Sequence, residues 1–287
     1  MKRLLLLLLC ATAHSFAQTP AAGPSEKNIS YLPAERKEKA DLYLPKEDGR
    51  KHPGVLIIHG GGWKGGIKDA KREINIGTTL AAHGYVCMSI DYQLDDPASP
   101  AICWPQNLHD CKTAVRWMRA NAERLHLDVD RIGVIGGSAG GHLASMVGVT
   151  GPESGLDPAG PYGGQSCKVS CVVDMYGPVD LENWKDISAL RTSRAQSPAL
   201  YKQFSVITHL DKQDPPFLIL HGTADTTVDV SQSKSLAAAL QKHGIEHHLE
   251  IIEDAPHTFH LQPKQKDLRP LVLAFFDKHL KGAAPTK

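Results

Sequence analysis

Residues 131–140 read Arg-Ile-Gly-Val-Ile-Gly-Gly-Ser-Ala-Gly, and this stretch decides the fold. Its first half is a short apolar run typical of a β-strand, and the residues that follow have the apolar spacing of a helix. A serine on a glycine-flanked turn between strand and helix is the pattern of a nucleophile elbow. The turn is so sharp that only small residues fit two positions before and after the serine. Ser138 is therefore the candidate nucleophile.

The pattern around Ser138 is only moderately specific by itself, because glycine and serine are common in loops without chemistry. A nucleophilic serine also needs hydrogen-bond donors for an oxyanion earlier in the chain, and an acid and then a histidine after it. The sequence contains all three in that order.

A glycine-rich loop, His59-Gly-Gly-Gly-Trp63, directly follows a strand-like run. Glycines let backbone N–H groups turn toward one point, where they can stabilise a developing alkoxide. A phosphate-binding loop is disfavoured because the Lys-Ser/Thr ending is missing. His59 is expected to hold the loop by hydrogen bonding, and Trp63 either lines a substrate pocket or packs on the loop. The predicted oxyanion donors are the N–H groups of Gly61, Gly62 and Ala139.

The acid and the base are expected in two loops near the C-terminus. Asp225 follows the strand-like run 217–221, where a carboxylate can fix the imidazole tautomer, and Asp229 is its nearest rival. The next strand-like run is followed by a loop with two histidines. His257 is the predicted base because it lies nearest the strand, and His260 is the alternative.

Other polar residues near these motifs are expected to be structural. His142 lies at the start of the helix after Ser138, and His221 ends a strand, so both are expected to pack or to form hydrogen bonds. Asp174 and Tyr176 lie at another strand end on the same rim, where such residues brace loops more often than they react.

Strand-like runs alternate with helical patterns along the chain, which predicts a mostly parallel sheet with right-handed crossovers and helices on both faces. The strand-like runs are 55–59, 85–91, 132–136, 169–175, 217–221 and 248–252, and the helical patterns are 71–83, 108–125, 141–149, 231–243 and 267–280. An additional early strand is expected at 40–44, in a direction that can be antiparallel.

The organisation predicts one catalytic domain over residues 40–282, preceded by a flexible segment over 18–39. Residues 181–216 form a polar, weakly helical insertion on the side of the sheet where α/β enzymes build substrate-facing walls. The insertion is too short for a full lid, so we expect a short cap and an open cleft.

Residues 1–17 have the pattern of a signal peptide: Lys2 and Arg3, then six leucines, then small residues at Ser15 and Ala17. The sequence thus predicts an exported protein, periplasmic or secreted. Without the leader the chain has 30 basic and 31 acidic residues. This balance gives no excess of positive charge for binding nucleic acid or an anionic membrane. No other stretch of the sequence is apolar enough to span a membrane.

Five cysteines follow the predicted leader, an odd number that implies at least one free thiol or an intermolecular bond. Cys87 lies in a strand-like run and is expected to be buried. Cys103 with Cys111, and Cys167 with Cys171, are near enough in sequence to pair. No spacing typical of a metal site occurs, so neither a metal nor a cofactor is expected.

The ordered motifs HGGGW, GGSAGGH, HGTADTTV and APHTF resemble the secreted bacterial α/β-hydrolase esterases related to hormone-sensitive-lipase-type, acetylxylan and feruloyl esterases. The resemblance covers roughly residues 40 to 280. It implies the α/β-hydrolase fold and a catalytic triad of Ser138, Asp225 and His257. Asp229 departs from the pattern, since such proteins often have proline there, and the short cap makes a long-chain lipase a poor fit.

By this resemblance we expect a serine carboxylesterase acting on short-acyl or aromatic-acyl esters, with acetylated or feruloylated carbohydrate as the favoured substrate. An amidase or aminopeptidase of the same fold is the main alternative. The first motif also resembles the HGGxW loop of kynurenine formamidases. A non-catalytic binding module is disfavoured because the whole triad is present. The oligomeric state stays open.

Overall fold

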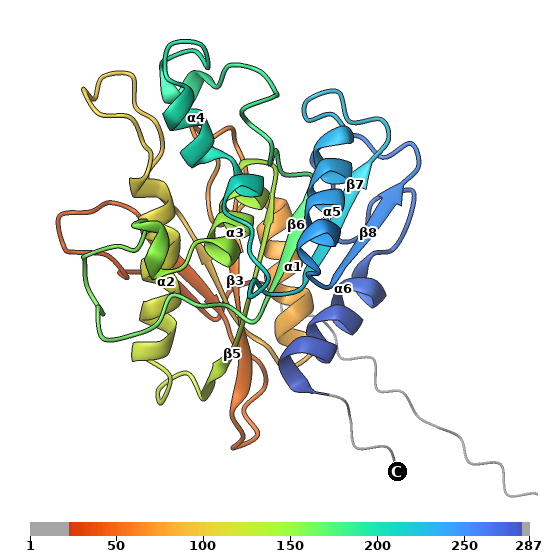
Figure 1. Ribbon diagram of the computed structural model, residues 1–287. Helices are drawn as coiled ribbons and strands as arrows, with labels where there is room; N and C mark the ends of the chain where they lie inside the picture. The colour runs from red at the N-terminus through yellow and green to blue at the C-terminus, as the bar shows by residue number, and fades with distance from the viewer. Residues whose placement is uncertain (1–22, 283–287) are drawn as a thin grey trace, which may run out of the picture.

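The computed structural model describes residues 23–282, and its centre is an eight-stranded sheet (Figure 1). The strands are β1 (Glu26–Ile29), β2 (Ala40–Tyr43), β3 (His52–Ile58), β4 (Val86–Ile90), β5 (Leu127–Gly137), β6 (Cys171–Met175), β7 (Phe217–Gly222) and β8 (His247–Ile252). They are arranged in the order β1-β2-β4-β3-β5-β6-β7-β8. The strands β4, β3, β5, β6, β7 and β8 are parallel. At one edge β2 pairs antiparallel with β4, and β1 pairs antiparallel with β2.

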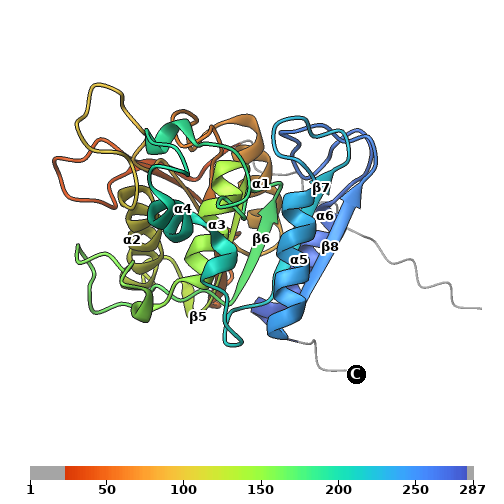
Figure 2. The same cartoon turned by 45° about the horizontal axis from the view of Figure 1, so that its top comes forward.

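Helices cover both faces of the sheet, as Figure 2 shows. One face is covered by α1 (Lys71–Ala82) and α6 (Arg269–Phe276), and the other by α2 (Gln106–Ala120), α3 (Ala139–Val149) and α5 (Ser231–His243). Short 3₁₀ helices occur at Pro152–Ser154, Ser188–Leu190 and Val206–Thr208, and α6 continues as a π-helical turn, Asp277–Lys281. The predicted α/β architecture with a mostly parallel sheet is confirmed.

The apolar runs of the central strands are continuous because both of their faces are buried. Successive side chains of a strand point to opposite faces. In β3, Leu56 packs in the hydrophobic cluster under α2 and α3, and the neighbouring Val55 packs under α1 and α6. Val134 and Ile135 of β5 divide in the same way. The core therefore has two halves, one on each side of the sheet.

The N-terminal segment corrects one prediction. Flexibility was expected over residues 18–39, but residues 26–29 form β1 and pair with β2, so the sheet begins before residue 40. The N–H of Ser25 donates to the carbonyl oxygen of Leu42 at 2.7 Å, and the N–H of Asn28 donates to Asp41 Oδ1 at 2.9 Å. Edge strands offer unpaired backbone groups that even a polar segment can satisfy. The predicted leader, 1–17, lies outside the described residues.

The insertion over 181–216 packs against α3 and contains one helix, α4 (Pro198–Phe204). It is held together internally: Tyr201 Oη accepts a hydrogen bond from the N–H of Ile187 at 2.6 Å and donates one to the carbonyl oxygen of Thr192 at 2.9 Å. Phe204, at the end of α4, is fully buried. The insertion is therefore a fixed wall of the molecule.

Candidate active site

Ser138 lies in the turn between β5 and α3, with φ 59° and ψ −125°, a conformation that L-residues rarely adopt. A Cβ at Gly136 would lie 2.2 Å from the carbonyl oxygen of Gly140, and a Cβ at Gly140 would lie 2.1 Å from that of Ile58. No side chain fits at such distances. Only glycine allows strand, turn and helix to pack this closely around the serine.

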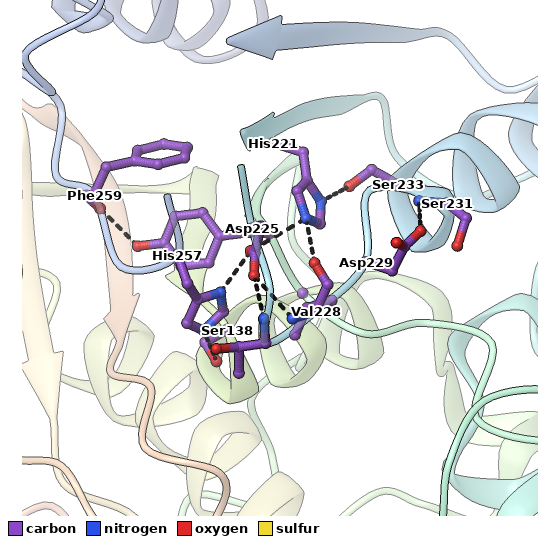
Figure 3. Close-up of polar contacts among 12 residues, drawn as sticks. Ser138, His221, Asp225, Val228, Asp229, Ser231, Ser233, His257 and Phe259 are labelled. Carbon is purple, nitrogen blue, oxygen red and sulfur yellow. Dashed lines mark hydrogen bonds and ion pairs between the residues drawn. The ribbon is translucent and has the colours of Figure 1, made fainter. Parts of the chain in front are cut away.

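The structure brings Ser138, His257 and Asp225 together at the carboxyl edge of the sheet, where parallel strands place such loops (Figure 3). Ser138 follows β5, Asp225 follows β7 and His257 follows β8. His257 Nε2 lies 2.9 Å from Ser138 Oγ, and its Nδ1 lies 2.6 Å from Asp225 Oδ2. The imidazole thus bridges a hydroxyl and a carboxylate, the arrangement of a serine nucleophile and its general base.

The Asp225 carboxylate is held in its ionised form. Burial opposes ionisation, but hydrogen bonds from His221, His257 and the N–H groups of Val228 and Thr227 outweigh it and keep the pKa of Asp225 well below its ordinary value. Its Oδ1 accepts both backbone bonds at 2.9 Å, which leaves Oδ2 for His257. An anion fixed in this way orients the imidazole and stabilises the imidazolium.

The two alternative residues lie away from this constellation. Asp229 Oδ1 accepts a hydrogen bond from the N–H of Ser231 at 2.8 Å, and Figure 3 shows its carboxylate on the side of α5. His260 Nδ1 accepts one from the N–H of Gln262 at 2.9 Å. Neither side chain contacts Ser138 or His257 within the described part of the chain.

The predicted oxyanion donors lie beside Ser138. Gly61 and Gly62 have φ values of 120° and 61°, which favour glycine. Within residues 23–282, the N–H groups of Gly61, Gly62 and Ala139 donate to no protein acceptor, and all three residues line the same cavity as Ser138. Ala139 begins α3, so the positive end of the helix dipole also faces this point.

Two of the buried histidines, His59 and His142, have structural contacts, as expected. His59 Nδ1 donates to the carbonyl oxygen of Gly60 at 2.7 Å, and its ring stacks on Tyr92 at 4.3 Å. His142 Nε2 donates to the carbonyl oxygen of Phe204 at 2.7 Å. Burial lowers the pKa of both His59 and His142 to about 4, so both rings are neutral at pH 7. Neither is suited to proton transfer.

His221 contacts the loop that carries Asp225. Its Nδ1 lies 2.7 Å from Ser233 Oγ, and its Nε2 lies 2.9 Å from the carbonyl oxygen of Val228 and 3.3 Å from Asp225 Oδ2. Because the ring is fully buried, these contacts fix the turn that carries Asp225.

A cavity of about 370 Å³ is lined by Ser138. One side is lined by the residues that the sequence singled out: Gly61, Gly62, Trp63, Ser138, Ala139 and His257. The stretch 184–188 of the insertion also lines the cavity. The sequence predicted that the insertion faces substrate, but it did not identify these residues.

Trp184 is the aromatic member of that wall and is half-buried. The Lys185 ammonium lies 4.1 Å from the centroid of the Trp184 ring and donates to the carbonyl oxygen of Thr227 at 3.0 Å. The wall is thereby tied to the loop of Asp225. A tryptophan in an insertion after a parallel strand was the only signal available in the sequence.

Trp63 lines the cavity and also packs on its own surroundings. Its ring contacts His142 edge-on, with centroids 5.2 Å apart, and Phe204, with centroids 5.0 Å apart. Only 4% of the residue is exposed, so most of the ring serves packing. A substrate contact by Trp63 stays a prediction.

All five cysteines among residues 23–282 are buried and free, so neither neighbouring pair is joined. In the same residues no group of His, Cys, Asp and Glu side chains is arranged to hold a metal ion. No helix in the described part of the chain is both long and apolar enough to cross a membrane.

Comparison with known proteins places the chain in a family. The BD-FAE family model matches residues 40–240. Esterase LipC of Mycobacterium tuberculosis is 32% identical over 216 residues, which cover 70% of this chain and 51% of LipC. The chain spans about half the length of the curated relatives it matches.

Solved structures agree with this placement. A truncated carbohydrate esterase from gut microbiota superposes with a TM-score of 0.81 at 27% identity, over 90% of this chain and 99% of that one. The acetyl ester-xyloside bifunctional hydrolase of Caldicellulosiruptor lactoaceticus gives a TM-score of 0.73 at 25% identity, over 89% and 94%. With the family model matching well over half of its residues, the chain belongs to the BD-FAE family and has the α/β-hydrolase fold.

Proposed function

We propose that this protein is a serine carboxylesterase that hydrolyses short-acyl or aromatic-acyl esters of carbohydrates through an acyl-enzyme. The observation that carries the proposal is the His257 ring, which lies 2.9 Å from Ser138 Oγ and 2.6 Å from Asp225 Oδ2. The relatives named as esterases and carbohydrate esterases support it.

The geometry suits two successive acyl transfers. Ser138 Oγ attacks the ester carbonyl while His257 Nε2 takes its proton, and the oxyanion forms beside the free N–H groups of Gly61, Gly62 and Ala139. His257 then returns the proton to the departing alcohol. Water attacks the acyl-enzyme with His257 again as base, which releases the acid and restores Ser138.

The substrate class is supported by the cavity and by two relatives. A volume of about 370 Å³ is near the lower end of the range for ligand sites, which suits a small acyl group and one sugar unit rather than a long chain. The half-buried Trp184 ring at its wall offers a surface on which a sugar or aromatic ring can stack. Solved relatives are described as a carbohydrate esterase and an acetyl ester-xyloside hydrolase.

The first test is Ser138→Ala, assayed with p-nitrophenyl acetate and an aminoacyl anilide. We expect the wild type to hydrolyse the ester and the variant to lose that activity by at least 10³-fold. Ser145→Ala is the matched control, since Ser145 lies on α3, which directly follows Ser138, and its buried hydroxyl has no hydrogen-bond partner among residues 23–282. Unchanged ester turnover in Ser138→Ala, or a clear preference of the wild type for the anilide, contradicts the proposal.

The second test separates the substrate class. Trp184→Ala is expected to raise KM for an acetylated xylo-oligosaccharide about tenfold, with little change for p-nitrophenyl acetate, because only the larger substrate reaches the wall. Equal KM changes for both substrates, or a wild-type preference for butyrate or longer esters, would reject carbohydrate esters as the substrate.

The site of action is also a proposal. The leader-like pattern over residues 1–17 supports export to the periplasm or beyond. Fractionation of a host that expresses the full chain, with Leu6→Arg as the variant that breaks the apolar run, tests it. The protein is expected outside the cytoplasm only when the run is intact.

A further inference from the structure

Arg72, on α1, is a buried cation to which the acyl-transfer steps assign no role. Its side chain is only 13% exposed and lines the active-site cavity. Nε and Nη2 donate to Glu73 Oε1 at 2.8 and 2.5 Å, and Nη1 donates to Tyr176 Oη at 3.0 Å. A buried guanidinium has a large desolvation cost, so its partners here must be well fixed.

Tyr176 extends this contact to the histidine loop. It follows β6, is fully buried, and its Oη donates to the carbonyl oxygen of Phe259 at 2.6 Å. Its ring meets the His257 ring edge-on, with centroids 4.9 Å apart and planes at 63°. Tyr176 therefore contacts the loop of His257 in two places, through the backbone two residues later and through the imidazole itself.

The Arg72 guanidinium also packs against the other two segments of the site. A Cβ at Gly60, in the oxyanion loop, would lie 3.3 Å from Arg72 Nη2 and 3.1 Å from the Cβ of Ser138. A Cβ at Gly137, directly before Ser138, would lie 2.7 Å from Arg72 Nη1 and 3.0 Å from Tyr176 Oη. Glycine at both positions leaves the space that the guanidinium and the phenol occupy.

We propose that Arg72 and Tyr176 are positioning residues that hold the Ser138 turn, the oxyanion loop and the His257 loop in register. The inference rests on the proposed function and adds to it. Glu73 neutralises the charge of Arg72, so the Arg72–Glu73 ion pair adds little net charge to the site. Arg72 and Tyr176 therefore act on the site by fixing the positions of its segments. Hydrogen bonds to charged groups are about twice as strong as neutral ones, and misplacing a reacting group by about 1 Å costs up to 10²-fold in rate.

The test is Tyr176→Phe, with Tyr43→Phe as the matched control. Tyr43 is also buried, but its hydroxyl has no hydrogen-bond partner in the described part of the chain. At a temperature well below unfolding, Tyr176→Phe is expected to lower kcat for p-nitrophenyl acetate at least tenfold, with KM changed less than twofold. The rate of Ser138 labelling by a fluorophosphonate probe is expected to fall in parallel. Tyr43→Phe is expected to match the wild type in both.

Variants of Arg72 provide an independent test of the proposal. Arg72→Met is expected to lose as much kcat as Tyr176→Phe, Arg72→Lys to recover part of it, and the double variant to be no worse than either single one, because the residues act as one unit. The proposal is overturned if Tyr176→Phe, or Arg72→Met where Tyr176→Phe does not fold, keeps wild-type kcat and labelling. Loss of the proposed function itself is recognised separately, by turnover that survives Ser138→Ala.

Discussion

Replacing Asp225 with asparagine tests the charge relation at the centre of the site. The carboxylate accepts two backbone N–H bonds on Oδ1 and faces His257 with Oδ2. In Asp225→Asn the amide oxygen keeps the backbone bonds, so the NH₂ group faces His257 Nδ1. The ring must then take its proton on Nε2. A protonated Nε2 donates toward Ser138 Oγ and cannot accept its proton.

The expected loss in kcat is about 10⁴-fold, or about 5 kcal/mol of activation free energy, as found where a triad aspartate is replaced by its amide. The assay is p-nitrophenyl acetate hydrolysis at pH 7, with the melting temperature measured in parallel to show that the variant is folded. Asp229→Asn is the matched control and is expected to lose less than twofold, because its carboxylate bonds only to the N–H of Ser231 at the start of α5. A loss below tenfold in Asp225→Asn, or an equal loss in Asp229→Asn, would refute the reasoning.

Two further predictions concern packing and pH. Gly140→Ala places a Cβ 2.1 Å from the carbonyl oxygen of Ile58, so we expect lost ester turnover and about 3 kcal/mol lower unfolding free energy in denaturant melts. Gly164→Ala, with open space around it, should change neither. Burial raises the pKa of Asp174 to about 6, so the folded state binds its proton more tightly and stability falls as the pH rises from about 4 to 6. The expected fall in unfolding free energy over this range is about 3 kcal/mol. Asp174→Asn keeps an acceptor for the N–H of Gly177 and should remove this fall. An unchanged pH profile of the unfolding free energy contradicts the prediction.

The fold was predictable from the chain because its strands are buried on both faces and therefore appear as uninterrupted apolar runs. The chemical motifs follow these runs directly, and the carboxyl ends of parallel strands meet at one edge, so the motif order places Ser138, Asp225 and His257 near one another. β1 was not predictable, since three of its four residues are polar and its pairing with β2 depends on backbone groups and on the Asp41 side chain, which leave no apolar pattern in the sequence.

The choice between neighbouring candidates for the acid and for the base depended on the three-dimensional structure. Asp225 and Asp229 are four residues apart, and the two loop histidines are three apart. Spacing along a loop does not say which side chain turns inward. The loop conformation does, because backbone N–H groups at Thr227 and Val228 capture Asp225 and the N–H of Ser231 captures Asp229.

Local sequence by itself determined the candidate nucleophile and the elbow that presents it, because a turn this sharp tolerates only glycine at positions 136 and 140. Tertiary structure alone decided what surrounds that serine. Arg72 and Tyr176 are 104 positions apart, and Trp184 reaches the cavity from an insertion with no motif of its own. Such contacts are made between side chains that only the packing of helices on the sheet brings together, and no local pattern records them.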